Sequence, residues 1–393
     1  MIKFARLASN LICDMLVAGL PVARKPWAHA ARAEVDSIPC DGAALLFAAG
    51  AARGITLLVL ADWLCALIDI VGNARFPSGA GAKGLDVDAS RRSAIMVVGF
   101  SCAIGAVLLG CAYLHAVDAP TYMIASNAGA LVCGLAGALV IASRPAFSRR
   151  VSDIAVLLMS LALVATALTG TSVAGASRWA SFGALVLQPS FIFLPAIMII
   201  HARQSSHASM LGVMLTVIAI AFQPDKAMSG ILVLGLASIA YGQLRRSSLI
   251  ALAGSVAAFT YVATVPVEIP TSPYADDVFA IAFDLHSGTA MAASIGVLLL
   301  LAPAIYGCMS RTIDRAQCVT FAAVWGGLIL AAVFGHSPTP VIGYGGSAIL
   351  GYLISLGILI SPNSRAQQLP SSAKLLPPLK LIDVSRFVRC LVA

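Results

Sequence analysis

The chain has 393 residues, of which 60% are hydrophobic and only 11% are charged. Soluble globular proteins carry about 25% charged residues, so this composition excludes a single water-soluble core and predicts an all-α, polytopic membrane protein. The apolar runs lack period-2 alternation, which excludes an outer-membrane barrel. The net charge of +8 resides mainly in short loops between apolar runs, so it indicates topology and not a nucleic-acid partner.

Residues 1–92 are predicted to be an N-terminal extension. Its two apolar segments, 7–22 and 54–72, are interrupted by aspartates, and an intramembrane carboxylate is costly. They are interpreted as an extra membrane hairpin, as interfacial helices, or as segments without a defined fold. The Gly/Ala-rich, acidic stretch 77–90 is predicted to be a linker.

Residues 93–361 are predicted to be the membrane domain. Its apolar segments, of which the longest approach the roughly 20 residues that a spanning helix needs, are 93–114, 122–142, 152–169, 183–200, 209–222, 228–243, 248–265, 277–305, 316–335 and 341–361. Basic residues concentrate in every second loop, and the loops 115–121, 266–276 and 336–340 contain no Lys or Arg. This alternation predicts ten core helices with both ends of the core in the cytoplasm.

The segment 362–393 is predicted to be a basic cytoplasmic tail. It contains four prolines and little periodicity, so it is interpreted as disordered or as ending in a short amphipathic helix on the inner leaflet. The nine cysteines of the chain show no metal-type spacing, so neither a disulfide framework nor a metal site is predicted.

Four polar blocks interrupt the apolar pattern. The first places Arg178 and Trp179 before Gln188, Pro189 and Ser190. Anchoring at the membrane interface explains a Trp and an Arg equally well, because Trp prefers the headgroup zone and Arg pairs with lipid phosphate.

The second block is Gln223-Pro224-Asp225. Asp225 is suited to a helix N-terminus, where a negative charge is favourable, or alternatively to an outer cavity, with Lys226 as a possible counter-charge. The third block spans 275–284 and contains Asp276 and Asp284. Asp284 lies inside an apolar run, where a buried carboxylate needs a partner or a proton.

The fourth block runs from Thr339 to Ala348 and contains Tyr344, Gly345, Gly346 and Ser347. Glycines let backbone bend and approach closely, and non-helical backbone survives in a membrane only where it is buried in protein or lines a cavity. At least one of the two glycines is expected to have a positive φ or to allow a close helix approach.

These blocks, in this order, resemble motifs of the SEDS family (shape, elongation, division and sporulation proteins, including FtsW, RodA and SpoVE). The family motifs are G-x-RRW…QPSE, (E/Q)PD, TDFIFAVIxEE and P-x-x-SYGGSS. This chain departs from them at several positions, which include the four named next. Phe191 stands at the family's Glu, Leu194 at its Lys, and Gly343 and Ala348 at its serines.

The resemblance implies a peptidoglycan glycosyltransferase that polymerises lipid II in the bacterial inner membrane, in cell division or cell shape. Substrate contacts would then fall to Arg178, Trp179, Gln188, Pro189, Ser190, Asp225, Tyr344, Gly345, Gly346 and Ser347. Glycosyl transfer needs a base for the acceptor hydroxyl and a cation for the departing diphosphate. Arg178 and Lys226, or a divalent cation such as Mg²⁺, would supply the cation.

The catalytic base has no clear match. Active family members carry it in a long outer loop, whereas the corresponding loop here is only 266–275. The candidates are Glu268, which that short loop contains, Asp276 and Asp225. Alternatives are therefore a catalytically degenerate scaffold that binds a lipid-linked precursor or a transpeptidase, and a precursor flippase. The resemblance also implies a single-pass class B transpeptidase as partner.

Overall fold

The computed structural model describes residues 6, 9–10, 13, 25–48, 50–51, 84–144, 147–183, 185–242, 245–267, 271–310, 313–335 and 337–362. The described residues up to 51 and those from 84 onward belong to two separate compact units. The predicted segment 54–72 and the tail beyond 362 lie outside the described residues.

The first unit contains α2 (Lys25–Ser37), a helix of 13 residues. This length is well below the roughly 20 residues that a membrane crossing requires. The helix buries one face, including Val35, against a small cluster that contains Cys13, Ala44 and Ala48. Arg6 fastens the unit, because its Nε lies 2.7 Å from an Asp41 carboxylate oxygen and its guanidinium also donates to the Val35 carbonyl.

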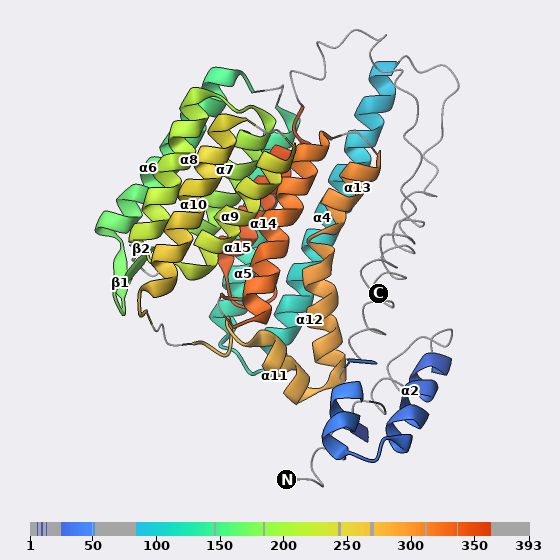
Figure 1. Ribbon diagram of the computed structural model, residues 1–393. Coiled ribbons are helices and arrows are strands. Elements are labelled where there is room, and N and C mark those ends of the chain that lie inside the picture. The colour runs from blue at the N-terminus through green and yellow to red at the C-terminus, as the bar shows by residue number, and fades with distance from the viewer. Residues whose placement is uncertain are drawn as a thin grey trace. The chain divides into compact units, whose positions relative to one another are not determined.

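The second unit is a bundle whose successive helices run up and down between its two ends (Figure 1). In chain order the helices are α4 (Gly84–Ala116), α5 (Thr121–Ser143), α6 (Arg149–Thr169), α7 (Pro189–Arg203), α8 (His207–Phe222), α9 (Lys226–Gly242), α10 (Arg246–Thr264), α11 (Val278–Leu285), α12 (Ser287–Leu299), α13 (Ala302–Ser310), α14 (Arg315–Val333) and α15 (Gly346–Ile360).

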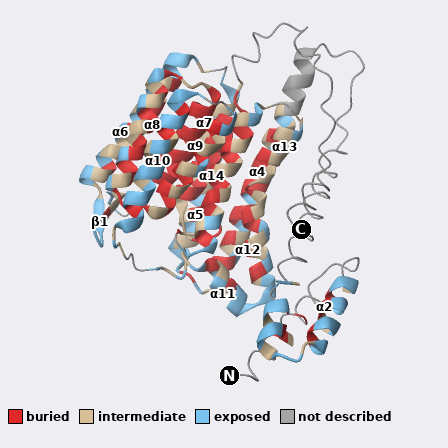
Figure 2. Cartoon of the chain, viewed as in Figure 1, coloured by how far each residue is buried: buried red, intermediate tan, exposed pale blue. Residues whose placement is uncertain are grey.

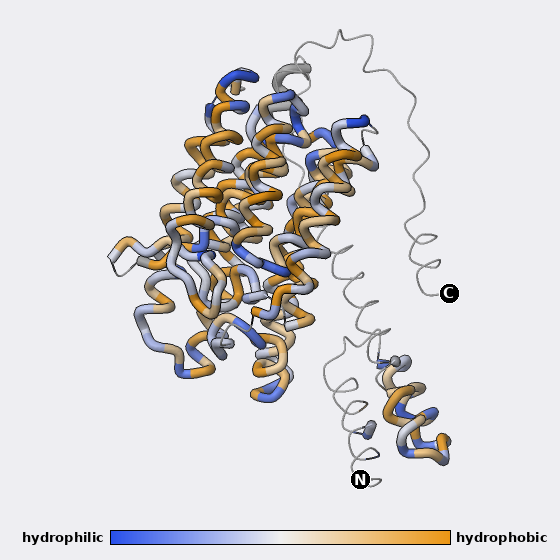
Figure 3. The backbone as a smooth tube through the Cα atoms, turned by 60° about the vertical axis from the view of Figure 1, so that its left-hand side comes forward, coloured by the Kyte–Doolittle hydropathy of each residue, from blue (hydrophilic) through white to orange (hydrophobic). Residues whose placement is uncertain are grey.

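Within the described residues, six helical segments are long and apolar enough to cross a membrane, with 287–310 counted as one. Four shorter apolar helices, α7, α8, α9 and α15, complete the bundle. Apolar residues follow the lengths of the helices in Figure 3. Every one of the ten predicted spans contains a helix, so the prediction of a polytopic helical bundle is confirmed.

Four predicted spans have different bounds in the structure. The helix of the span 93–114, α4, begins at Gly84, so the described residues 84–90 of the predicted linker 77–90 are helical. The span 183–200 begins only at Pro189, because the residues before it form antiparallel strands: β1 (Thr171–Val173), β2 (Ala176–Phe182) and β3 (Leu185–Leu187). The span 277–305 is broken at His286, whose backbone is extended at φ −160° and ψ 146°. The residues 341–345, predicted as the start of the last span, form a turn.

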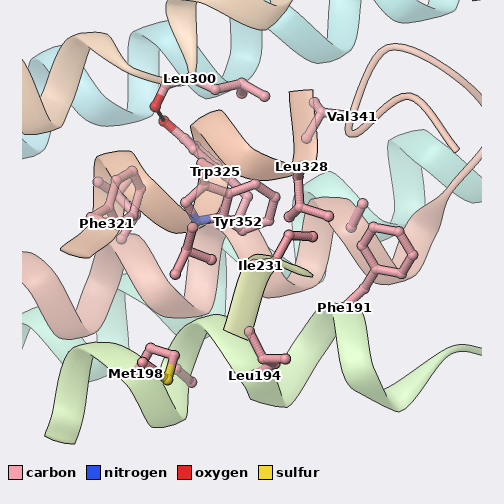
Figure 4. Close-up of a cluster of buried hydrophobic side chains, with 14 of the residues drawn as sticks. Phe191, Leu194, Met198, Ile231, Leu300, Phe321, Trp325, Leu328, Val341 and Tyr352 are labelled. Atoms are coloured by element: carbon pink, nitrogen blue, oxygen red, sulfur yellow. Dashed lines mark hydrogen bonds between the residues drawn. The ribbon is translucent and has the colours of Figure 1, made fainter. Parts of the chain in front are cut away.

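The core lies where α7, α9, α14 and α15 pack together (Figure 2). Nearly all residues of α7 are buried, as expected for a helix that is apolar all round. At the centre the Trp325 and Tyr352 rings meet edge to face with centroids 5.1 Å apart. Their polar atoms are satisfied, since Trp325 donates to Ser355 Oγ and Tyr352 donates to the Leu300 carbonyl (Figure 4).

A buried arginine joins the ends of three helices. Arg203, the last residue of α7, donates to Gln317 Oε1 of α14 at 3.1 Å and to Ser361 Oγ at 2.8 Å. It also donates to the Ile358 and Ser361 carbonyls at the C-terminus of α15. The last carbonyls of a helix lack intrahelical donors and carry partial negative charge, so the arginine is paired in a place where a cation is favourable.

Candidate functional site

The four polar blocks lie at the same end of the bundle. The strands between α6 and α7, the loop between α8 and α9, the chain before α11 and the turn before α15 all occupy the end opposite to Arg203 (Figure 1). This follows from the up-and-down order of the helices. Between each of these connections and the next, the chain runs along the bundle once in each direction, so it returns to the same end. Segments far apart in the sequence are thereby brought into contact.

Arg178, Gln188 and Asp225 form the centre of the site. Asp225 precedes α9 and is 2% exposed. Its Oδ1 accepts from the Met228 backbone N–H at 3.1 Å, which is the N-cap pattern. Its Oδ2 accepts from Gln188 Nε2 at 3.1 Å and lies 3.6 Å from Arg178 Nε.

The Nε and Nη2 groups of Arg178 are engaged by the protein. It donates to the Gln223 carbonyl at 3.3 Å and to the Pro224 carbonyl at 2.5 Å, in addition to its ion pair with Asp225. Arg178 is positioned by β2, where its neighbour Trp179 pairs across the sheet with Thr171. Within the described residues no hydrogen bond joins the Trp179 side chain to this network.

The turn before α15 reaches the same network. Ser347 Oγ accepts from the Gln188 backbone N–H at 2.9 Å, which fixes the residue before the N1 proline, Pro189. Gln188 Nε2 also donates to Ser190 Oγ at 3.3 Å. Five of the predicted contact residues (Arg178, Gln188, Ser190, Asp225 and Ser347) are therefore directly connected.

Asn127 holds the Tyr344 turn and was not predicted from the sequence. Its amide donates to the Gly343 carbonyl at 3.0 Å, and its Oδ1 accepts from the Gly345 N–H at 3.2 Å. Its side chain, on α5, is fully buried. The feature of the sequence that could have indicated this role is an amide side chain within an otherwise apolar span. Tyr344 itself donates its N–H to the Tyr274 carbonyl at 2.6 Å.

The expectation about Gly345 and Gly346 is wrong. Gly345 has φ 179°, which is extended backbone, and a Cβ at Gly346 would lie at an ordinary 3.4 Å from Ala130 Cβ. The close approach occurs at Gly343 instead, where a Cβ would come within 3.0 Å of the Tyr274 and Ala275 carbonyl oxygens. In this turn the left-handed conformation belongs to Val341, at φ 69°.

Phe191 and Leu194 fill a helix interface (Figure 4). Their exposed fractions are 4% and 0%, and both belong to the apolar core. The α7 backbone at Phe191 lies against α15 so closely that a Cβ on Gly351 would overlap the Phe191 carbonyl oxygen. The two positions that differ from the SEDS motif are thus packed, apolar and without room for a polar ligand.

The remaining carboxylates occupy different surroundings. Asp276 is half-buried and accepts from the Ser272 N–H at 2.8 Å; burial raises the pKa of its carboxyl, and the neighbouring Asp277 adds to the rise. Asp284 is exposed at the end of α11, so the expectation that it is buried is wrong. Glu268 lies outside the described residues.

Two buried polar atoms at this end of the bundle lack a hydrogen-bond partner among the described residues. They are Gln223 Oε1 and Thr339 Oγ1, and buried polar atoms are normally satisfied by protein, water or ligand. Lys226 is half-exposed beside Asp225. No three His, Cys, Asp or Glu side chains of the described chain lie together as a metal site.

No protein-family model and no curated protein matches the chain. The chain is similar to a crystal structure of the rod shape determining protein RodA of Thermus thermophilus, with 19% identity, a TM-score of 0.46, and coverage of 66% of this chain and 93% of that one. A mutant of the same protein gives 20% identity and a TM-score of 0.47, with 66% and 94% covered.

A chain from a structure entitled "Structural coordination of polymerization and crosslinking by a peptidoglycan synthase complex" gives 17% identity and a TM-score of 0.41. The match covers 70% of this chain and 95% of that one. All three similarities concern the fold, and at these identities and TM-scores they assign no activity to this chain.

Proposed function

We propose that this chain is a divergent SEDS-type protein of peptidoglycan synthesis that binds a lipid-linked precursor and, alone, polymerises lipid II weakly or not at all. The observation that carries the proposal is the convergence of four motif-like blocks on one connected network. Arg178 and Gln188 from the α6–α7 connection, Asp225 from the α8–α9 connection and Ser347 at the start of α15 are joined by hydrogen bonds and an ion pair. The third block is attached to the fourth, since the Thr339 N–H donates to the Ala275 carbonyl at 2.7 Å.

Precursor binding is supported by the polar groups at this end of the bundle. Lys226 is a half-exposed cation next to the network, and Gln223 Oε1 and Thr339 Oγ1 are buried acceptors without a described partner. A cation and hydrogen-bonding groups suit a diphosphate-linked sugar. Arg178 serves a different purpose, because its donors are already directed at Asp225 and two carbonyls: it positions the site.

Weak polymerisation is expected because no residue of the chain clearly matches the family's catalytic base. The base that accepts the proton of the attacking sugar hydroxyl typically contributes about 10²- to 10⁴-fold in rate. Both oxygens of Asp225 are engaged by donors, which leaves Asp276 as the described carboxylate with a raised pKa in an outer connection. Phe191 and Leu194, at the positions of the family's Glu and Lys, are buried and apolar.

The proposal includes the remaining implications of the resemblance. The protein is a multi-pass membrane protein, and we place it in the bacterial inner membrane with the motif end facing outward. A class B transpeptidase is its proposed partner. A scaffold that binds the precursor or that partner without any catalysis remains the second candidate, favoured by the packed apolar environment of Phe191.

The decisive experiment measures polymerisation of labelled lipid II by the purified full-length protein, together with lipid II binding. We expect binding without robust polymer, and we expect Lys226→Ala to weaken the binding. Robust polymerisation would refute the inactive part of the proposal. In that event Glu268→Ala, Asp276→Ala and Asp225→Asn identify the base: the variant that loses polymerisation about 10²- to 10⁴-fold while keeping the melting temperature of the unchanged protein marks it. Asparagine is used at position 225 because it keeps an acceptor for the α9 cap. Absence of lipid II binding would refute the proposed function, and precursor flux across vesicles without polymer would favour a flippase.

A further inference from the structure

A cavity of about 240 Å³, which Met210 and His207 also line, lies at the end of the bundle opposite to the motif blocks. Its lining includes the side chains of Arg149 and Arg245 and the hydroxyl residues Ser205, Ser206 and Ser247. This volume is below the roughly 300–1,000 Å³ of pockets for drug-sized ligands. A small polar group is therefore the kind of ligand that fits.

The cavity sits between three helix N-termini. Arg149 is the first residue of α6, Ser206 is the N-cap of α8, and Arg245 is the N-cap of α10. None of the three helices has an acidic residue in its first turn. Helix N-termini carry partial positive charge and favour anions, so all three direct a positive field to the same place.

The two exposed arginines add further positive charge to these helix N-termini. Cations are favourable at helix C-termini and unfavourable at N-termini, yet α6 begins with Arg149 and Arg150, and α10 begins at Arg245 and Arg246. In the described part of the chain neither Arg149 nor Arg245 has an ion-pair or side-chain hydrogen-bond partner. The α10 N-terminus also lacks a side-chain cap, so its first amides keep their donors available.

One carboxylate approaches the cavity. Asp153, one turn into α6, accepts from Ser206 Oγ at 2.5 Å, and Ser206 in turn caps α8 through the Ser209 N–H at 2.9 Å. Asp153 thus holds the cap of α8. Its single negative charge is smaller than the positive charge of the two guanidinium groups and the three helix N-termini together. The uncompensated charge at this cavity is positive.

We infer that this cavity binds the phosphate of an anionic membrane lipid, with Arg149 and Arg245 as the residues that clamp it. Arginine favours phosphate because its planar fork donates two hydrogen bonds at once, and the Ser247 hydroxyl and the uncapped amides of α10 supply further donors. A lipid is the source of the phosphate because the cavity opens at the basic end of membrane-spanning helices, where headgroups lie.

The test uses the full-length protein in neutral detergent, titrated with short-chain phosphatidylglycerol, phosphatidylcholine or inorganic phosphate, with bound lipid counted by native mass spectrometry. We expect phosphatidylglycerol to be retained and phosphatidylcholine to be lost. The double variant Arg149→Ala/Arg245→Ala should bind phosphatidylglycerol roughly 10- to 100-fold more weakly. The matched control Arg150→Ala/Arg246→Ala removes the same charge from neighbouring positions outside the lining and should bind as the unchanged protein does.

Equal losses in the two double variants would overturn the inference, because they would show a general charge effect. Equal retention of both lipids, or tight binding of inorganic phosphate alone, would overturn the assignment to an anionic lipid. Ser247→Asp guards against a variant that merely fails to fold. It places a carboxylate in the uncapped first turn of α10, which favours the helix, and should abolish lipid binding while leaving the melting temperature unchanged or higher.

Discussion

Arg178 Nε lies 3.6 Å from Asp225 Oδ2, so a strand between α6 and α7 is ionically paired with the loop that begins α9. The side chains are 13% and 3% exposed, and the pair is completed by Gln188 and by two backbone carbonyls. The motif end of the bundle therefore depends on one buried carboxylate that pairs with two side chains of the α6–α7 connection and caps α9.

Asp225→Ala should destabilise the protein strongly. It leaves the Arg178 charge and the Gln188 amide without their acceptor, and removes the cap of α9. Loss of one partner of a buried pair costs about 3–5 kcal/mol, and loss of a cap about 1 kcal/mol. Asp225→Asn keeps an acceptor for the cap and should cost less. Thermal unfolding of both variants in the same detergent checks this order, and equal melting temperatures for Asp225→Ala and the unchanged protein would contradict it.

Gly351→Ala should impair folding because the new methyl group would overlap the Phe191 carbonyl oxygen of α7. Overpacking of this kind costs typically about 1–3 kcal/mol, and here the obstacle is backbone, which cannot rotate away. Gly346→Ala should be tolerated, since its Cβ would meet Ala130 at 3.4 Å.

The matched control is Gly137→Ala in α5, where no heavy atom lies within 4 Å of the added Cβ. Membrane accumulation and melting temperature are the measurements. If Gly351→Ala accumulates as well as Gly137→Ala does, the close α7–α15 contact is not required for the fold.

The orientation of the bundle is open to a direct test. The structure places Ser206 and Arg246 at one end and Ser272 at the other, and the loops at the first end are basic. The preference of cytoplasmic loops for Lys and Arg predicts that reporter fusions at Ser206 and Arg246 are cytoplasmic and that a fusion at Ser272 is periplasmic. A cytoplasmic signal at Ser272 would reverse or overturn the topology.

The Asp276 carboxyl should make stability depend on pH. Burial raises its pKa in the folded protein, whereas the unfolded chain keeps the ordinary value of about 3.9. Below that value both states are protonated and the residue has no effect. As the pH rises through the folded pKa, the folded state must bury a charge, so stability is lost. Asp276→Asn keeps an acceptor for the Ser272 N–H and carries no charge.

The melting temperature of Asp276→Asn should therefore equal that of the unchanged protein in acid and exceed it at neutral pH. Asp284→Asn is the matched control, because it removes one carboxylate that is exposed and lies outside the Ser272 turn. A gap between the two proteins that closes as the pH rises would show that the carboxylate of Asp276 is stabilised by its surroundings and not penalised.

The helical bundle could be predicted from the sequence because each membrane-spanning segment has its own run of apolar residues. It was insufficient for the strands before Pro189, since short pairs of strands depend on partners in space and carry little periodicity. It also assigned the close approach to the wrong glycines. Gly343 and Gly351 are crowded by the backbones at Ala275 and Phe191, and contacts between distant segments have no local signal. For the site, the residues of the four blocks were predicted from the sequence. The contacts by which Asn127 holds the Tyr344 turn were not predicted.

Phe191→Glu should destabilise the protein and should not restore polymerisation. The side chain at this position is 4% exposed and packs in the core between α7 and α15, so the new carboxylate would be buried without a described cation beside it. An unpaired buried charge is costly enough that the group takes up a proton instead. Phe191→Gln introduces a polar group without a charge, and Phe191→Leu changes only the volume of the side chain. We therefore expect the melting temperature to decrease from Phe191→Leu to Phe191→Gln to Phe191→Glu. Lipid II polymerisation is measured on the same preparations. A stable Phe191→Glu protein with robust polymerisation would show that this position faces the substrate, and that one substitution is what keeps the chain inactive.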